Sequence, residues 1–502
     1  MRTFMYPYFI SLSLFLLYNS GAHSQAYKFI EYPEGKNAQV YALDNFDEKE
    51  AFLMAFKFDS HFDFLFLDQE MNLVRKVQSE DLPARYEGRQ IHSIMNSEKE
   101  VLVFLDAGTR KNSYRTILYR FNKDTGNYKD EEVLDLPEET IQMLEKSKVR
   151  LLKVFQYGDR FYKIWVDIKN SQLHIFYYQL GTNRISQFES LDIPKAELGK
   201  LLGKRKVIPT PVITHPEDAS VISNAKQEKI YVFGDELVFS IENPETGNTE
   251  IIAINTEKWE MNLEFYPIPD FTPKDELNQF NSYIYDDHLF QVYFSSKGLK
   301  LSKRSFESGE VIMEKSWKNR NSFYDDFQLR RKRQYISGRL REDEDPKLWK
   351  QFGRSVSLHI QSEGDFERLV IGSHRYMKQK DRDVVNTIGT IAAIAAETGA
   401  GVWVGGNGAV DIFVDPFTPI NMVIDAVYYF SDGRIFQGDT YFNSETFAVS
   451  PYGIETGKWD RIMKQVNDEE AERNTRSISL FEFNEKVYFG YWQKKRYYLL
   501  EM

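Results

Sequence analysis

The stretch Asp59-Ser60-His61-Phe62-Asp63 places two carboxylates and an imidazole within five residues. These side chains can hold a metal ion or move protons in general acid–base catalysis. A metal site would need a third or fourth ligand from elsewhere in the chain. Asp and Ser also gather in hairpin turns, because their side chains hydrogen-bond to nearby backbone groups. We interpret the stretch as a hairpin turn, with Asp63 on the polar face of the next strand.

A second group of the same kind is Asp286-Asp287-His288. It aligns with Tyr157-Gly158-Asp159 and Phe233-Gly234-Asp235, each of which comes directly before a strand-like run. A site that recurs once per unit indicates turn geometry rather than catalysis. His215-Pro216-Glu217-Asp218 lies in a proline-rich connection and is too isolated to assign.

Two charged runs follow each other in the second half of the chain. Glu342-Asp343-Glu344-Asp345 lacks the glycine and the alternating spacing of a calcium loop, which predicts a solvated loop or a weak cation patch. Arg330-Arg331-Lys332-Arg333 precedes it. The two runs can attract each other, or the basic run can meet an acidic partner; an exposed charged helix or loop is the plainer interpretation.

Composition and motifs exclude several function classes. The net charge of −11 argues against a nucleic-acid binder. The absence of cysteine excludes a disulfide, a thiolate metal site, a cysteine nucleophile and a lipid-modified cysteine. The sequence contains no Gly-x-Ser-x-Gly, no phosphate loop, no His-Glu-x-x-His and no dinucleotide fingerprint. We therefore assign no catalytic, cofactor-binding or metal-binding residue and expect no cofactor.

Residues 1–24 have the pattern of a signal peptide. Arg2 supplies one positive charge, Phe9 to Tyr18 form a short apolar run, and Ala22-His23-Ser24 puts small residues at the −3 and −1 positions. About ten apolar residues are too few for the ~20 that a membrane-spanning helix needs. We predict cleavage before Gln25, a secreted or periplasmic protein, and no transmembrane span in the mature chain.

A tripeptide recurs through the first half of the chain. Asp81-Leu82-Pro83, Asp135-Leu136-Pro137 and Asp192-Ile193-Pro194 each follow strand-like sequence, and Tyr266-Pro267-Ile268-Pro269-Asp270 resembles a degenerate fourth copy. Proline ends a strand because it has no N–H, and Asp can cap a following turn. The tripeptide therefore predicts the exit from one β unit. We expect helices after the second and third copies, over Glu138–Lys146 and Lys195–Leu202.

The strand pattern predicts an all-β fold. Each unit has a turn, a strand, a second turn and a second strand, as at Phe161 to Ile168 and Leu173 to Leu180. Five clear and two blurred units of three or four antiparallel strands fit a β-propeller of about seven irregular blades, with six as the alternative. The isolated strand Tyr27–Tyr32 can complete the sheet of the C-terminal strands and close the ring. Residues 25–502 form this β-propeller-like domain.

These units, with their Tyr-Gly-Asp, Phe-Gly-Asp and Tyr-Asp-Asp starters, resemble those of secreted β-propeller proteins of uncharacterised function. The resemblance covers roughly residues 40–315 and the C-terminal end, and it is one of pattern. It implies the architecture and no catalytic residue.

One apolar insert, Asp381 to about Asp415, breaks the regular pattern. Val384, Ile388, Ile391 and their neighbours follow helical spacing, and Asn407-Gly408 then joins two strand-like runs as a hairpin turn. The insert either packs on the propeller as core or is an exposed element for a partner protein or a membrane surface. We expect an exported, non-catalytic binding or scaffold protein that meets another envelope or extracellular protein through 381–415. The alternative is a propeller-type carbohydrate-active hydrolase or lyase, with carboxylates or His at one mouth.

Overall fold

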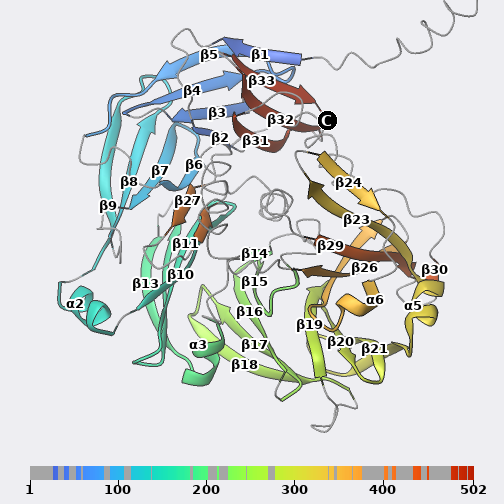
Figure 1. The fold of residues 1–502 in the computed structure, drawn as a ribbon. Helices are drawn as coiled ribbons and strands as arrows, with labels where there is room; N and C mark the ends of the chain where they lie inside the picture. Colours follow the sequence, from blue (N-terminus) through green and yellow to red (C-terminus); the bar gives the residue numbers. More distant parts are fainter. Residues whose placement is uncertain are drawn as a thin grey trace, which may run out of the picture.

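The structure is a computed structural model. It describes residues 27–31, 39–43, 52–57, 60–83, 91–106, 115–136, 138–147, 149–180, 185–201, 212–213, 224–244, 246–269, 277–336, 339–343, 348–363, 366–375, 401–404, 410–413, 434–442, 449–450, 476–483, 486–493 and 496–501. These residues are mostly strands, gathered into separate sheets that stand around a ring (Figure 1). Neighbouring strands of a sheet are antiparallel with few exceptions, and most follow one another in the chain. The predicted all-β propeller is thereby confirmed; the number of its blades stays a prediction.

Four sheets follow one another in the first part of the ring. The first two contain β2 (Gln39–Leu43), β3 (Phe52–Lys57), β4 (Phe62–Leu67) and β5 (Leu73–Gln78), then β6 (Ile91–Asn96), β7 (Glu100–Asp106), β8 (Arg115–Asn122) and β9 (Tyr128–Asp135). The next two contain β10 (Arg150–Tyr157), β11 (Arg160–Asp167), β12 (Gln172–Gln179) and β13 (Ile185–Asp192), then β14 (Val212–Ile213), β15 (Glu228–Phe233), β16 (Glu236–Asn243), β17 (Asn248–Asn255) and β18 (Glu260–Pro267). In the last of these, β14 pairs with β15 in parallel.

Two further sheets complete the second part. The first contains β19 (Leu277–Tyr285), β20 (His288–Ser295), β21 (Gly298–Ser305) and β22 (Val311–Trp317). The second has the order β24-β23-β29-β26-β25, with β30 paired to β29. Its strands are β23 (Gln328–Ile336), β24 (Arg339–Asp343), β25 (Ser357–Glu363), β26 (Phe366–Arg375), β29 (Arg434–Phe442) and β30 (Val449–Ser450). Since β23 and β24 precede β25 in the chain, this sheet departs from simple hairpin order.

The two ends of the chain meet in one sheet, in the order β1-β33-β32-β31 (Figure 1). Its strands are β1 (Tyr27–Glu31), β31 (Arg476–Phe483), β32 (Lys486–Gln493) and β33 (Arg496–Glu501). Tyr27 lies opposite Leu500, and Glu31 opposite Arg496. The prediction that the N-terminal strand completes the C-terminal sheet is confirmed. The pairing covers an edge of β33 and closes the ring.

Alternate residues of the central strands enter two different cores. Val101, Val103 and Leu105 of β7 pack with the β2–β5 sheet, whereas Leu102 and Phe104 pack with the β10–β13 sheet. Side chains of a strand point alternately to its two faces, so a sheet packed between two others buries both. This is why strands such as β4, which is buried at all six positions, read as continuous apolar runs.

The described helices lie in the connections between sheets. They are α2 (Glu138–Ser147), α3 (Lys195–Leu201), α5 (Arg320–Asp326) and α6 (Leu348–Gln351). The predicted helices after the second and third tripeptides are confirmed as α2 and α3.

Candidate functional site

The structure brings the Asp59–Asp63 stretch and the first tripeptide together. Ser60 donates its hydroxyl to Asp81 Oδ1 over 2.9 Å, and His61 Nδ1 lies 3.8 Å from the same atom. The predicted turn between β3 and β4 is confirmed. Asp63, however, is buried rather than on an open polar face, and Lys76 Nζ of β5 lies 2.7 Å from its Oδ2. These hydrogen bonds and ion pairs stabilise the turn and the strand beside it, so we assign the stretch a structural role. Asp59 lies outside the described residues.

The first and third copies of the tripeptide join the end of an outer strand to a turn of the same sheet. Leu82 donates its N–H to the Ser60 carbonyl over 2.6 Å, and Ile193 donates its N–H to the Ser171 carbonyl over 2.9 Å. Ile268 of the degenerate copy donates in the same way to Gly247. The Asp81 side chain accepts a hydrogen bond from the preceding β3–β4 turn. The turn that we expect Asp81 to cap lies outside the described residues.

The Gly-Asp turns join neighbouring sheets. Arg160, which follows Gly158-Asp159 in the β10–β11 turn, forms an ion pair with Asp235 of the β15–β16 turn. Its Nη1 also donates to the Gly234 carbonyl over 2.6 Å. Burial raises the pKa of the adjoining Tyr162 to about 12, against the opposing charge of Arg160. The turns predicted at Gly158-Asp159 and Gly234-Asp235 are confirmed, and their contacts pack two neighbouring sheets together.

The Asp286–Asp287 turn between β19 and β20 carries the third of these motifs. Both aspartates have a positive φ, 45° and 55°, which Asp tolerates better than most residues. Burial raises the pKa of Glu367, at the start of β26, while the charge of Lys303 lowers it and that of Asp286 raises it. A carboxyl group with a raised pKa beside a second carboxylate is the arrangement of a general acid. Sequence reasoning missed Glu367, because Glu367 and Asp286 are far apart in the chain and come within electrostatic reach only when it folds.

Asp167, His174 and Ser190 have the residue types of a nucleophilic triad. Ser190 Oγ lies 2.8 Å from His174 Nδ1, and burial lowers the pKa of His174 against the charge of Asp167. A triad also needs a hydrogen bond from the imidazole to the acid. His174 Nε2 lies 3.8 Å from Asp167 Oδ2, which is longer than a hydrogen bond. Asp167 instead accepts from the backbone and side chain of Asn170, which closes the β11–β12 turn.

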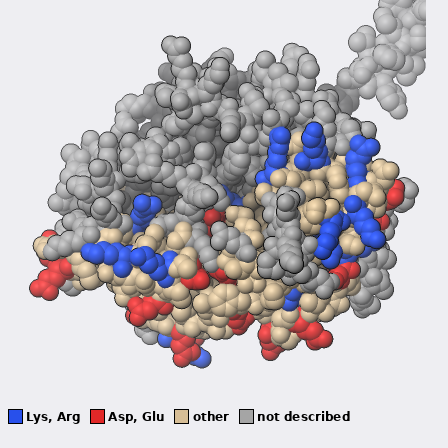
Figure 2. Space-filling view, turned by 60° about the horizontal axis from the view of Figure 1, so that its bottom comes forward, with Lys and Arg blue, Asp and Glu red and all other residues tan. Residues whose placement is uncertain are grey.

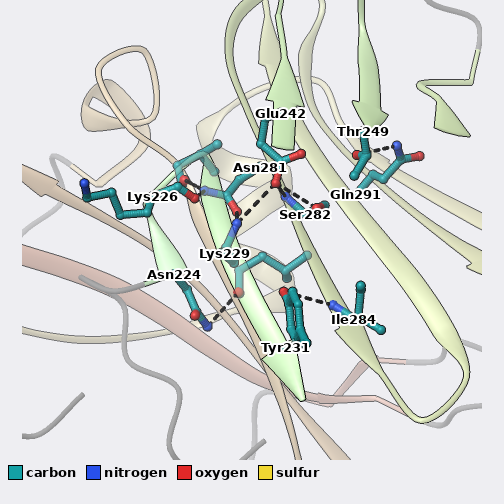
Figure 3. Close-up of polar contacts among 12 residues, drawn as sticks. Asn224, Lys226, Lys229, Tyr231, Glu242, Thr249, Asn281, Ser282, Ile284 and Gln291 are labelled. Carbon is teal, nitrogen blue, oxygen red and sulfur yellow. Dashed lines mark hydrogen bonds and ion pairs between the residues drawn. The ribbon is translucent and has the colours of Figure 1, made fainter. Parts of the chain in front are cut away.

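A buried polar network occupies the seam between the β14–β18 and β19–β22 sheets (Figure 3). Lys229 of β15 lies with its Nζ 3.2 Å from Glu242 Oε1 of β16, and both side chains are 0% exposed. The same Lys229 Nζ donates to Asn281 Oδ1 over 2.9 Å, and Ser282 donates its N–H and its hydroxyl to Glu242 Oε1. Every charge in this group is met by a partner from the neighbouring sheet.

The network continues to a third sheet. Asn281 donates through Nδ2 to the carbonyl of Val356, just before β25, and Asn224 donates to the carbonyl of Leu358 within it (Figure 3). Because these groups are buried and mutually paired, they hold three sheets together and offer no exposed acid or base. A charge inside an otherwise apolar strand, as at Lys229 and Glu242, is the sequence signal that would have found them.

The two charged runs lie opposite each other in a hairpin. In the register of β23 with β24, Lys332 faces Asp343 and Arg333 faces Glu342. Mutual attraction of the runs, one of the alternatives from the sequence, agrees with this register. The helix or loop expected for the basic run is wrong, because Arg330 to Arg333 lie within strand β23. Glu344 and Asp345 lie outside the described residues, as does the whole of 215–218.

The apolar insert falls within one connection of a single sheet. It leaves after Arg375 of β26 and the chain returns at Arg434 of β29, and these two residues are partners in the β26–β29 register. The hairpin predicted around Asn407-Gly408 is confirmed: β27 (Gly401–Val404) pairs with β28 (Val410–Phe413). The predicted helix before it lies outside the described residues.

Among the described residues, no group of three or more His, Asp or Glu side chains is arranged to hold a metal ion. None of the helices in that part of the chain is long and apolar enough to cross a membrane.

No protein-family model matches the sequence, and no curated protein matches it either. Among solved structures, similarity extends to the β-fructofuranosidase BmSUC1 of Bombyx mori, a GH32 enzyme, at 9% identity over 87% of this chain and 98% of that one, with a TM-score of 0.28. The β-propeller domain of the Trilobed protease from Pyrococcus furiosus aligns at 9% identity over 81% of this chain and 78% of that one, with a TM-score of 0.25.

A prolyl endopeptidase aligns at 9% identity over 64% of this chain, with a TM-score of 0.24, and the chain spans only 37% of its length. At such identities and TM-scores these alignments carry no argument about activity. The fold assignment therefore stands on the sheet topology.

Proposed function

We propose that the protein is an exported, non-catalytic binding or scaffold protein that engages another envelope or extracellular protein through 381–415. The observation that carries this proposal is the Arg375–Arg434 register pair. A ladder joins β26 and β29 directly, so a two-residue turn suffices to connect them. The sheet therefore does not require residues 376–433, and a long apolar segment that the fold does not require is a candidate for binding.

The test replaces residues 376–433 by Asn-Gly, a dipeptide suited to a tight hairpin turn. We expect the shortened chain to keep its circular dichroism spectrum and to lose a partner that the full chain captures from an envelope fraction. A second variant, Ile388→Ser with Ile391→Ser, changes only two apolar positions of the insert and should weaken the same capture. Unchanged partners for both variants would remove the insert from the function.

Export is part of the proposal and rests on residues 1–24. Mass spectrometry of the protein recovered from its native cells should find the first residue at Gln25. An N-terminus at Met1 would contradict the proposed export route.

The second candidate function is a carbohydrate-active hydrolase or lyase. It is favoured by Glu367, whose pKa is raised by burial and which lies within the electrostatic reach of Asp286 and His288. Glycosidases pair a protonated carboxyl group with a second carboxylate. Turnover of a polysaccharide by the full chain, lost in Glu367→Gln and kept in Asp287→Asn, would establish this function in place of the first.

A further inference from the structure

We propose that a basic patch, formed by the β20–β21 turn and by the connection between β22 and β25, binds an acidic polysaccharide. The patch contains five exposed cations: Lys297, Lys318, Arg320, Lys350 and Arg354. It is independent of the proposed partner site, because it uses none of residues 376–433.

A close backbone contact brings the first cations together. Lys297 lies in the turn between β20 and β21, and Lys318 follows β22. Gly298 has φ +118°, and a Cβ placed there would lie 2.2 Å from the Trp317 carbonyl oxygen and 3.0 Å from Lys318 Cα. Only glycine allows this approach, so the turn presses directly against the start of the link to α5. Lys297 and Lys318 consequently emerge from adjoining backbone.

A cluster of aromatic rings fixes α5 and α6 beside that turn. Phe323 of α5 lies 5.8 Å from Trp317, 5.9 Å from Trp349 and 5.3 Å from Phe352, measured between ring centroids. Phe294, at the end of β20, lies 5.4 Å from Trp349. Buried aromatic contacts of this kind hold their backbones in fixed relative positions. The backbones of all three segments that carry the cations are therefore held in fixed relative positions.

A helix cap fixes the start of α5. Asn319 caps the helix by accepting from the N–H groups of Asn321 and Ser322, and Ser322 completes a capping box. The cap thus fixes the backbone position of Arg320, the first residue of the helix. Its neighbour one turn later, Tyr324, accepts a hydrogen bond from the Trp349 N–H over 3.4 Å. This bond links the two helices at the surface of the patch.

Four of the five cations of the patch have no ion-pair partner among the described residues. Lys315 and Asp326 pair at 3.1 Å and neutralise each other. By contrast, the described part of the chain contains no ion pair for Lys318, Arg320, Lys350 or Arg354. Figure 2 shows Lys and Arg in separate groups at the left and the right of one face, while Asp and Glu lie mainly along its lower rim. A local positive surface on a chain of net charge −11 selects an anionic ligand.

The rings among the cations favour a sugar polymer as the source of that charge. Trp349 and Tyr324 are half-buried and adjoin Lys350 and Arg320. An aromatic face suits the apolar C–H face of a sugar ring, and guanidinium groups bind carboxylates through paired hydrogen bonds. A polymer of uronic acids presents both features in every residue, whereas an acidic protein segment lacks the ring.

The test measures binding of the full chain to immobilised alginate, with neutral dextran as the reference surface. Binding should weaken as salt rises from about 0.01 M to about 1 M, over which the Debye length falls from about 30 Å to about 3 Å. The variant Lys318→Glu, Arg320→Glu, Lys350→Glu, Arg354→Glu should bind roughly ten- to a hundredfold more weakly. A matched variant, Lys129→Glu with Lys258→Glu, changes exposed lysines elsewhere and should bind as the unchanged chain does.

Three results would overturn the assignment. The first is absence of alginate binding at low salt by a chain with an unchanged circular dichroism spectrum. The second is an equal loss per reversed charge in the matched variant, which would show a net-charge effect. The third is binding of polyglutamate or single-stranded DNA that is as tight as that of alginate or tighter, which would indicate an acidic protein or a nucleic acid as the ligand of the patch.

Discussion

Ser60 and Asp81 are 21 residues apart in the chain and share a hydrogen bond of 2.9 Å. Beside it, the N–H of Leu82 meets the carbonyl of Ser60. The same backbone tie recurs between Ile193 and Ser171. The repeated tripeptide therefore joins the end of an outer strand to a hairpin turn of the same sheet through a backbone hydrogen bond.

Truncating Leu82, the apolar residue of the first tripeptide, should destabilise the fold. Leu82 is 4% exposed, so Leu82→Ala creates a cavity and should lower the free energy of unfolding by about 2–5 kcal/mol. Leu73→Ala is the matched control, because Leu73 is 45% exposed in the preceding strand and should change it by about 0.5 kcal/mol at most. Urea unfolding midpoints measure both. Equal midpoints for the two variants would show that the tripeptide carries no packing role.

Removing one partner of the Lys229–Glu242 pair should lower the free energy of unfolding far more than replacing both partners by apolar residues. Lys229→Met leaves a buried carboxylate without its cation and should cost about 3–5 kcal/mol. The double variant Lys229→Met, Glu242→Leu removes both charges and should recover most of that loss, although Ser282 and Asn281 lose an acceptor or a donor. A double-mutant cycle by urea unfolding measures the coupling. Additive single effects would mean that the two groups do not interact.

His174 should make stability depend on pH in mildly acid solution. Burial lowers its pKa in the folded chain, against the opposing charge of Asp167, so the unfolded chain takes up its proton first. Its contribution is complete above the ordinary histidine pKa of about 6.5 and is lost as pH falls towards the lower folded value. His174→Gln should flatten the loss of stability over that window. The measurement is the unfolding midpoint between about pH 7 and about pH 5, with His288→Gln, at the half-buried start of β20, as control. A loss of equal steepness in His174→Gln would contradict this.

Loss of the N-terminal strand should open the ring. A chain that lacks residues 1–31 leaves β33 without β1 and exposes an unpaired strand edge. We expect lower stability and self-association, seen by size-exclusion chromatography and thermal unfolding. The matched control lacks residues 1–26 only and keeps β1 intact. If both shortened chains stay monomeric and equally stable, closure by β1 is dispensable.

The sequence by itself determined the fold class, most central strands and the helices α2 and α3. Those strands were readable because they are buried on both faces, as β4 is, and so form continuous apolar runs. The outer strand β22 was missed, because it alternates exposed and partly buried positions and carries Glu314 and Lys315. Such a strand looks like a polar connection until its partner is known, because half of its pattern comes from the sheet beside it.

Only the tertiary structure decided which charged groups meet. Lys229 and Asn281 belong to different sheets, and the cations of the basic patch come from three separate segments. The order of β23 before β25 in their shared sheet also has no local signal. Local propensity acts over a few residues, whereas these contacts depend on how whole sheets stand around the ring.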